Sequence, residues 1–226
     1  MDFHSQTVMV TGAGGNLGRA LAGHFASLGA RLALLDLKIE AEAPHLALPA
    51  NLLEQAEVDA AVQKTLERFG RIDVLCNLAG GFRMGDPVHA TPDKTWNFLL
   101  DLNARTLLHM ARAVVPHMIA ARRGKIVNVG AFAAQKGAAH MGAYIASKSA
   151  VIRLTESMAA ELREQNINVN CVLPAIIDTP ENRAAMPKAD PARWVAPQEL
   201  ARVIAFLASD DARAIHGAAL PVTGLS

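Results

Sequence analysis

Cysteine is scarce in this sequence: there are only two, Cys76 and Cys171, and both lie inside apolar runs. The N-terminus has no basic region followed by a long apolar run, so we expect no secretory signal and therefore no disulfide. No apolar stretch approaches the ~20 residues that span a bilayer. These absences favour two buried thiols in a cytoplasmic protein without a membrane partner.

An excess of either charge is also missing, because 22 Lys and Arg residues offset 21 Asp and Glu residues and leave a net charge of +1. No basic block exceeds the pair Arg122 and Arg123, which argues against nucleic acid as a partner. No group of His, Cys, Asp and Glu has the spacing of metal ligands, so we expect no catalytic metal. The expected partner is a small-molecule substrate.

Apolar β-rich runs alternate with helical patterns along all 226 residues. The pattern predicts strands at residues 7–12, 30–36, 46–49, 71–80, 124–130, 167–174 and 218–224. It predicts helices at residues 16–29, 52–70, 91–122, 142–165 and 197–209, with loops at 37–45 and 175–191. Such alternation is typical of an α/β fold, a doubly wound parallel sheet of about seven strands with helices on both faces. No linker interrupts it, so we expect one domain, residues 1–226.

A glycine-rich turn joins the first predicted strand to the first helix. It contains Gly12, Gly14, Gly15 and Gly18. Glycine allows the backbone to approach a pyrophosphate closely, and the N-terminus of the following helix offers free N–H groups to an anion. The turn therefore indicates a dinucleotide site, with an ordinary tight turn as the alternative.

A carboxylate follows at the end of the second predicted strand. Asp36 lies 18 residues beyond Gly18, where it can accept hydrogen bonds from ribose hydroxyls and repel a 2′-phosphate. Lys38 is the only nearby basic residue that could bind such a phosphate. The pattern favours NAD over NADP, and hence NADH over NADPH.

Five motifs in this order resemble those of the short-chain dehydrogenase/reductase family. They are TGAGGNLG (Thr11–Gly18), NLAG (Asn77–Gly80), LNA (Leu102–Ala104), YIASK (Tyr144–Lys148) and PAIIDTP (Pro174–Pro180). The resemblance covers essentially the whole chain and implies a Rossmann-type domain that binds NAD. It departs from the family at two glycine positions, which hold Asn16 and Ala175 here.

The resemblance also implies which residues contact the cofactor. They are Gly12, Gly14, Gly15, Asn16, Leu17, Gly18, Asp36, Asn51, Leu52, Asn77, Ala79, Gly80, Tyr144, Lys148, Pro174, Ile177 and Thr179.

Tyr144, the only tyrosine in the chain, is the candidate proton donor. A phenol titrates near pH 10, but Lys148 lies one helical turn away on the same face, so its positive charge favours the tyrosinate. By resemblance, Lys148 also holds the nicotinamide ribose, and Asn103 supports a water-linked proton path behind it. The alternative for the pair is a surface aromatic that packs on a lysine stem.

The family carries a serine about 13 residues before the tyrosine, but here that position is Ala131. No serine or threonine occurs between Gly124 and Tyr144. Three interpretations stay open. The substrate needs no hydroxyl donor, another group such as Gln135 or His140 supplies one, or the chain is a catalytically impaired NAD-binding sensor or scaffold.

The stretch DTPENRAAMPKADPARW (Asp178–Trp194) resembles the corresponding stretch of dihydropteridine reductases, which also have alanine at the serine position. The resemblance implies hydride transfer from NADH to a conjugated carbonyl or imine such as a quinonoid dihydropteridine. A conjugated ring spreads the incoming charge and so needs less help from a donor than a ketone does. Asn103 departs from that subgroup and follows the wider family, which keeps a general carbonyl reductase or alcohol dehydrogenase open.

Six residues are candidates to line the substrate pocket, with residues 175–196 as a lid over it. They are Phe82, Ala131, Gln135, His140, Met186 and Trp194. The helices predicted at residues 91–122 and 142–165 carry apolar residues on more than one face, which favours a partner subunit. We expect a homodimer or homotetramer that pairs through these two helices, as is common in the family.

Overall fold

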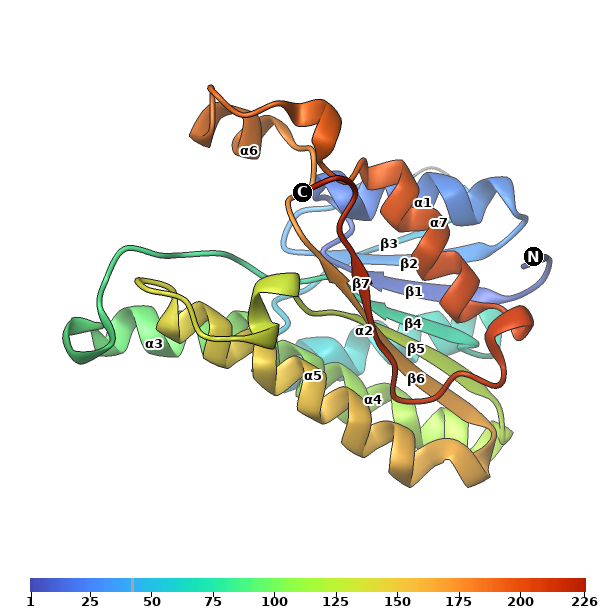
Figure 1. Ribbon diagram of the computed structural model, residues 1–226. Coiled ribbons are helices and arrows are strands. Elements are labelled where there is room, and N and C mark those ends of the chain that lie inside the picture. Colours follow the sequence, from blue (N-terminus) through green and yellow to red (C-terminus); the bar gives the residue numbers. More distant parts are fainter. Residues whose placement is uncertain (42) are drawn as a thin grey trace.

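A seven-stranded, fully parallel sheet forms the centre of the computed structural model, which describes residues 1–41 and 43–226 (Figure 1). The strand order is β3-β2-β1-β4-β5-β6-β7. The strands are β1 (Thr7–Thr11), β2 (Arg31–Asp36), β3 (Leu46–Pro49), β4 (Val74–Asn77), β5 (Gly124–Val129), β6 (Ile167–Pro174) and β7 (Ala219–Val222). The predicted doubly wound α/β fold is confirmed.

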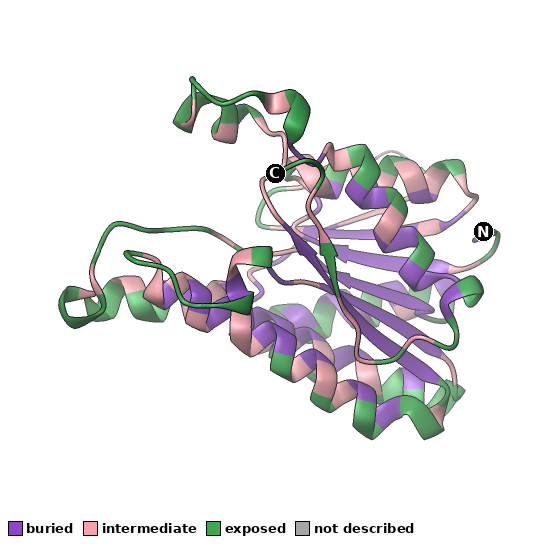
Figure 2. Cartoon of the chain, in the orientation of Figure 1, coloured by how far each residue is buried: buried purple, intermediate pink, exposed green. Residues whose placement is uncertain are grey.

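Helices cover both faces of the sheet. They are α1 (Asn16–Ser27), α2 (Gln55–Phe69), α3 (Asp93–Leu100), α4 (Thr106–Ala121), α5 (Gly142–Leu162), α6 (Pro180–Ala185) and α7 (Pro197–Ala208). Helices α1 and α7 pack on one face, and α2, α4 and α5 pack on the other (Figure 1). The central strands β1, β4, β5 and β6 are buried almost throughout, whereas the edge strand β7 has no buried residue. The loops beside α3 and α6 are largely exposed (Figure 2).

The order of the strands reverses between β1 and β4, because the chain first runs outward from β1 through β2 to β3 and then returns to pair β4 with β1. At such a point the connections leave the carboxyl ends of two neighbouring strands in opposite directions and open a crevice. The glycine-rich turn after β1 and the exit of β4 therefore border the same opening.

Three segments differ from the sequence prediction. Helix α2 begins at Gln55, because Asn51 uses its side-chain Oδ1 to accept a hydrogen bond from the Leu53 N–H and so forms a turn first. The predicted 175–191 loop contains α6, which Thr179 caps through its hydroxyl. The predicted long helix 91–122 is interrupted by a π-helical turn, Asp101–Arg105.

The expectations of no disulfide, no metal site and no membrane-spanning helix can be compared with the part of the chain that the structure describes. Both cysteines are buried and unpaired, as predicted. Within residues 1–41 and 43–226, no three His, Cys, Asp or Glu side chains are arranged to hold a metal ion. No helix in that part of the chain is both long and apolar enough to cross a membrane. The predicted loop 37–45 includes Glu42, which lies outside the described residues.

The expected pairing of subunits through α4 and α5 stays a prediction. On α4, Leu108 and Ile119 are exposed large hydrophobic side chains. They agree with a surplus apolar face on this helix.

Candidate active site

The glycine-rich turn requires glycine where it folds back on itself. A Cβ on Gly18 would lie 2.2 Å from the carbonyl oxygen of Gly12, closer than any two such atoms can approach. Gly12 has φ +64°, and a Cβ there would lie 3.0 Å from the Ala79 nitrogen at the exit of β4. The glycines thus allow the turn, the first residues of α1 and the β4 exit to meet.

Asp36 is held in place by this turn. Its Oδ2 accepts a hydrogen bond from the Gly14 N–H at 2.9 Å, and its Oδ1 accepts one from the Leu37 N–H at 2.7 Å. Both bonds fix the carboxylate at the end of β2, where it borders the cavity. The second lone pairs of both oxygens remain open to further donors, such as ribose hydroxyls.

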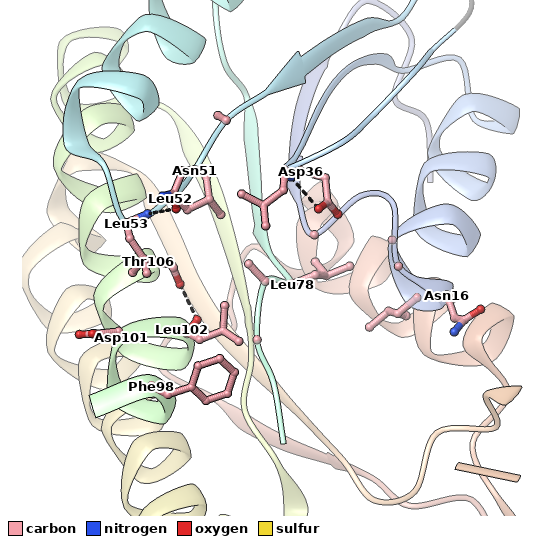
Figure 3. Close-up of a pocket in the computed structure, with 18 of the residues that line it drawn as sticks. Asn16, Asp36, Asn51, Leu52, Leu53, Leu78, Phe98, Asp101, Leu102 and Thr106 are labelled. Carbon is pink, nitrogen blue, oxygen red and sulfur yellow. Dashed lines mark hydrogen bonds between the residues drawn. The ribbon is translucent and has the colours of Figure 1, made fainter. Parts of the chain in front are cut away.

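A cavity of about 610 Å³ opens between the β1 turn and the helices beyond β4 (Figure 3). Asp36 and Asn16 lie on one side of it, and Phe98, Leu102 and Thr106 lie on the other. Twelve of the residues predicted to contact a cofactor line it. They are Gly12, Gly15, Asn16, Leu17, Gly18, Asp36, Asn51, Leu52, Ala79, Gly80, Ile177 and Thr179.

Other lining residues were missed by the sequence reasoning. They are Leu37, Ala50, Leu53, Leu78, Phe98, Asp101, Leu102 and Thr106. The last four belong to a long helical pattern, which shows an apolar face without showing what that face covers. Leu37 and Ala50 directly follow predicted strands, so their position after a carboxyl end was the available signal. Leu78 lies near the end of a predicted strand and Leu53 at the start of a predicted helix.

The predicted cofactor residues outside the cavity lining have other surroundings. Gly14 holds Asp36 through its N–H. Asn77 is buried beneath the crevice and donates through Nδ2 to Oδ1 of Asn128 at 2.9 Å. Pro174 is the last residue of β6 and is buried. Whether these residues contact a cofactor stays a prediction.

The exit of β4 brings Gly80, Asn103 and Lys148 together. A Cβ on Gly80 would lie 2.8 Å from Asn103 Oδ1 and 3.1 Å from Lys148 Nζ, so any larger residue there would displace these side chains. Asn103 accepts a hydrogen bond from the Gly81 N–H at 2.9 Å and donates to the Gly81 carbonyl at 3.1 Å and to Ser147 Oγ at 2.9 Å. Its side chain therefore anchors the β4 exit to α5.

Asn103 lies in the π-helical turn that separates α3 from α4. Such turns widen the hydrogen-bond ladder of a helix and often occur at functional sites. The sequence reasoning missed this turn, because Asp101–Arg105 contains no glycine or proline that would mark a break in the helix. The predicted water-linked path behind Lys148 stays a prediction.

Lys148 is a buried cation, with only 6% of its surface exposed. Its Nζ donates a hydrogen bond to the carbonyl of Val129 at 2.8 Å. Burial lowers the pKa of Lys148 to about 8, while the neighbouring Cys171 raises it slightly. The Lys148 amine is thus protonated at neutral pH, but burying its charge costs free energy of folding.

Tyr144 lies one turn before Lys148 on α5, and the ring of Phe82 meets its ring edge to face with 4.8 Å between centroids. Burial raises the pKa of Tyr144 to about 12. We expected the Lys148 charge to favour the tyrosinate, and for this structure that expectation is wrong, because burial is the only cause of the shift and Lys148 contributes nothing to it. The phenol keeps its proton at neutral pH and can donate it.

Ala131 is buried in an apolar cluster and follows β5. The nearest serines along α5 are committed elsewhere: Ser147 Oγ donates to the Tyr144 carbonyl at 2.8 Å, and Ser149 Oγ donates to the Ala134 carbonyl at 3.1 Å. These bonds agree with the sequence reasoning that no neighbouring hydroxyl replaces the missing serine.

The remaining substrate candidates are not all brought together. Phe82 contacts Tyr144, and His140 uses its ring to bond Gly85 in the loop that carries Phe82. Gln135 is exposed on the loop before α5, and Met186 follows α6 half-buried.

Trp194 was predicted to line the substrate pocket, and its side chain is buried, with 6% of its surface exposed. It does not border the cavity. Whether Trp194 borders the substrate site beside Tyr144 stays a prediction.

The polar residues of the 178–194 motif bond to one another. Asp178 accepts two hydrogen bonds from the Arg183 guanidinium, at 2.6 and 2.7 Å. Asn182 donates its N–H to the Thr179 hydroxyl at 3.2 Å and its side-chain Nδ2 to the Ile177 carbonyl at 2.8 Å. This part of the motif builds α6 and the turn before it, so it specifies a local structure rather than a substrate contact.

Asn16 uses its side chain to contact α6. Its Nδ2 donates to Glu181 Oε2 at 3.0 Å, which joins the glycine-rich turn to the 175–196 segment. The asparagine that replaces a glycine thus has a structural partner, and its backbone dihedrals stay helical as the first residue of α1.

Comparison with known proteins agrees with this geometry. A family model described as enoyl-(acyl carrier protein) reductase matches residues 12–224. The chain is 33% identical to 2-(R)-hydroxypropyl-CoM dehydrogenase of Xanthobacter autotrophicus (97% of this chain, 98% of the relative) and 30% identical to 3-oxoacyl-[acyl-carrier-protein] reductase FabG of Escherichia coli (99% and 98%). Among solved structures, NAD⁺-bound xylitol dehydrogenase matches with a TM-score of 0.89 at 29% identity, over 99% of this chain and 100% of that one.

These matches define the class of protein. The chain belongs to the short-chain dehydrogenase/reductase family of oxidoreductases and is an enzyme of that family.

Proposed function

We propose that the chain binds NAD(H) in the cavity described above and transfers hydride between the nicotinamide and a small conjugated carbonyl or imine. The proposal rests on one observation. Gly80 lines the cavity that Asp36 also lines, and a Cβ built on Gly80 would lie 3.1 Å from Lys148 Nζ and 2.8 Å from Asn103 Oδ1. A dinucleotide with its adenosine ribose on Asp36 therefore extends toward the Tyr144–Lys148 pair.

The proposed roles follow from the protonation states. When bound, the nicotinamide ring supplies or accepts the hydride. Tyr144 holds a proton at neutral pH and donates it to the substrate oxygen or nitrogen. Lys148, one helical turn from Tyr144, binds the nicotinamide ribose through its ammonium. Residues 175–196 form the lid, with α6 joined to the cofactor turn through Asn16.

Ala131 selects the substrate class in this proposal. Loss of one hydrogen-bond donor at a developing oxyanion raises the activation free energy by ~2.7–4 kcal/mol. A substrate that spreads the charge over a conjugated ring avoids this cost. A quinonoid dihydropteridine is one member of this class. Its support is the sequence likeness at residues 178–194, whose polar side chains bond to one another, so we give the pterin no preference over other conjugated substrates.

A general carbonyl reductase or alcohol dehydrogenase is the second candidate, supported by the names of the relatives at 30% and 33% identity. A screen of NADH oxidation with ketones, conjugated enones, quinones and quinonoid dihydropterin separates the candidates. Turnover on conjugated acceptors with little on simple ketones supports our proposal. Faster turnover on simple ketones contradicts it, and NADH binding without any turnover favours a sensor or scaffold.

Cofactor preference depends on Asp36 in this proposal. Replacing Asp36→Asn removes the repulsion of a 2′-phosphate, so we expect the ratio of kcat/KM with NADPH to that with NADH to rise at least ~10-fold, or ~1.4 kcal/mol. The matched control is Asp101→Asn, because Asp101 also borders the cavity but pairs with Arg105 at 2.7 Å. An unchanged ratio in Asp36→Asn would show that another residue excludes the phosphate.

Restoring the missing hydroxyl tests the role of Ala131. We expect Ala131→Ser to raise kcat/KM on simple ketones by ~10–100-fold, part of the ~10²–10³-fold effect of an oxyanion donor. Activity on conjugated acceptors should change little, because they need the donor less. Ala133→Ser, a half-buried position two residues on, is the control for added polarity. If ketone turnover stays flat in Ala131→Ser, the pocket itself rejects these substrates.

A further inference from the structure

The loop that follows β4 is attached at two points on either side of Phe82. At Gly81, the Asn103 side chain makes two hydrogen bonds, as described above. At Gly85, the backbone N–H donates to the His140 carbonyl at 2.9 Å, and the His140 ring Nδ1 lies 3.1 Å from the Gly85 carbonyl. Phe82 lies between these two attachments, with its ring against Tyr144.

The contact between His140 and Gly85 is reciprocal and specific. A carbonyl oxygen can only accept, so the Nδ1 of His140 carries the proton and donates it. His140 has φ +62°, a left-handed conformation that costs most non-glycine residues ~1–2 kcal/mol. In this conformation both the carbonyl and the ring of His140 bond to the backbone of Gly85.

We propose that His140 is a positioning residue that holds Phe82 against Tyr144 and thereby forms the wall of the substrate site. This inference deepens the proposed function and rests on it. His140 itself does not donate a proton to the substrate, because its Nδ1 proton is engaged with Gly85. Phe82, more than half exposed, presents the rest of its ring surface to a flat substrate beside the phenol.

Two substitutions separate the ring bond from backbone strain. His140→Gly keeps the left-handed conformation freely but removes the Nδ1 donor. His140→Asn tolerates positive φ and places an amide Nδ2 donor near the position of Nδ1. We expect His140→Gly to raise KM for the substrate ~3–10-fold, the worth of an aromatic contact, and His140→Asn to restore it. NADH affinity should stay unchanged in both variants, since neither His140 nor Phe82 lines the cofactor cavity.

A double-mutant cycle tests whether His140 acts through Phe82. In the Phe82→Leu background we expect His140→Gly to have little further effect on KM. Additive effects of the two substitutions would overturn the proposal. His89→Ala, an exposed histidine of the same loop, is the control and should behave like the wild type.

A readout without turnover distinguishes this inference from the proposed function. Because Tyr144 is the only tyrosine, the ultraviolet absorbance of tyrosinate follows its ionisation directly. Loss of the Phe82 contact should expose the phenol and shift that titration to lower pH in His140→Gly but not in His140→Asn. A shift in the absence of any turnover would support the positioning role while the proposed function fails. An unshifted titration in an active enzyme would overturn the positioning role alone.

Discussion

Tyr144→Phe is expected to lower kcat by ~10²–10⁴-fold while NADH affinity stays nearly unchanged. The substitution removes the hydroxyl and keeps the ring that packs edge to face on Phe82 at 4.8 Å, so the site should retain its shape. The proton that burial keeps on the phenol, with its pKa near 12, is the group that is lost. Steady-state kinetics on the best conjugated acceptor, with NADH binding by fluorescence titration, measures both quantities.

The two quantities have to separate for the assignment of Tyr144 to hold. Loss of turnover in proportion to loss of NADH affinity would make Tyr144 a cofactor contact only. Equal turnover in the two proteins would remove Tyr144 from the mechanism and assign proton donation to another group.

Lys148→Met is expected to reduce kcat/KM by at least ~100-fold and at the same time to stabilise the protein measured without cofactor. The pKa of Lys148 falls from 10.5 to about 8 on folding, a cost of roughly 3 kcal/mol at 1.36 kcal/mol per pKa unit. The lost hydrogen bond to Val129 offsets part of this gain, although that half-buried residue can bond water instead. We expect a net gain of ~1–2 kcal/mol at pH 7, or a few degrees in Tm.

The pH dependence gives the sharper test of Lys148. Between pH 8 and 10.5 the unfolded chain binds more protons at this residue than the folded chain does, so wild-type stability gains from rising pH. The advantage of Lys148→Met should therefore be largest below pH 8 and shrink toward pH 10.5. Lys136→Met, an exposed lysine of the loop before α5, should show neither effect. A destabilised Lys148→Met at neutral pH would mean that the buried ammonium is well compensated.

The fold was largely predictable because every strand is short, apolar and bounded by turn residues. Strands β3 and β6 begin and end at the predicted residues, and the parallel sheet follows from alternation with helices. Helix α6 was missed because only six residues form it, between prolines, and its cap and Asp178–Arg183 pair depend on folded geometry. The π turn at Asp101–Arg105 was missed because no glycine or proline marks it in the sequence.

The candidate site was predictable where backbone geometry determines which residue is needed. Glycines at close approaches and a carboxylate at a strand end leave a sequence pattern, and twelve of the predicted residues line the cavity. The raised pKa of Tyr144 has no sequence pattern, because it depends on how deeply the phenol is buried. The side of the cavity formed by Phe98, Leu102 and Thr106 also has no sequence pattern of its own. A helical pattern does not reveal which cavity the helix face borders.

The 178–194 motif shows how sequence likeness can overstate a substrate. Its Asp, Thr, Asn and Arg side chains bond within the segment, and Trp194 at its end is buried. A shared motif of this kind indicates a shared lid structure. The substrate of this chain depends instead on the groups around Tyr144, of which Ala131 and Phe82 are the most distinctive.

A crystal structure of the protein with NADH tests the central claim most directly. We expect the adenosine ribose hydroxyls on the Asp36 carboxylate, the nicotinamide ribose on Lys148, and the Tyr144 hydroxyl facing the C4 edge of the nicotinamide. A nicotinamide ring bound away from α5, or a Tyr144 hydroxyl directed away from C4, would contradict the account even if the adenosine occupied its predicted place.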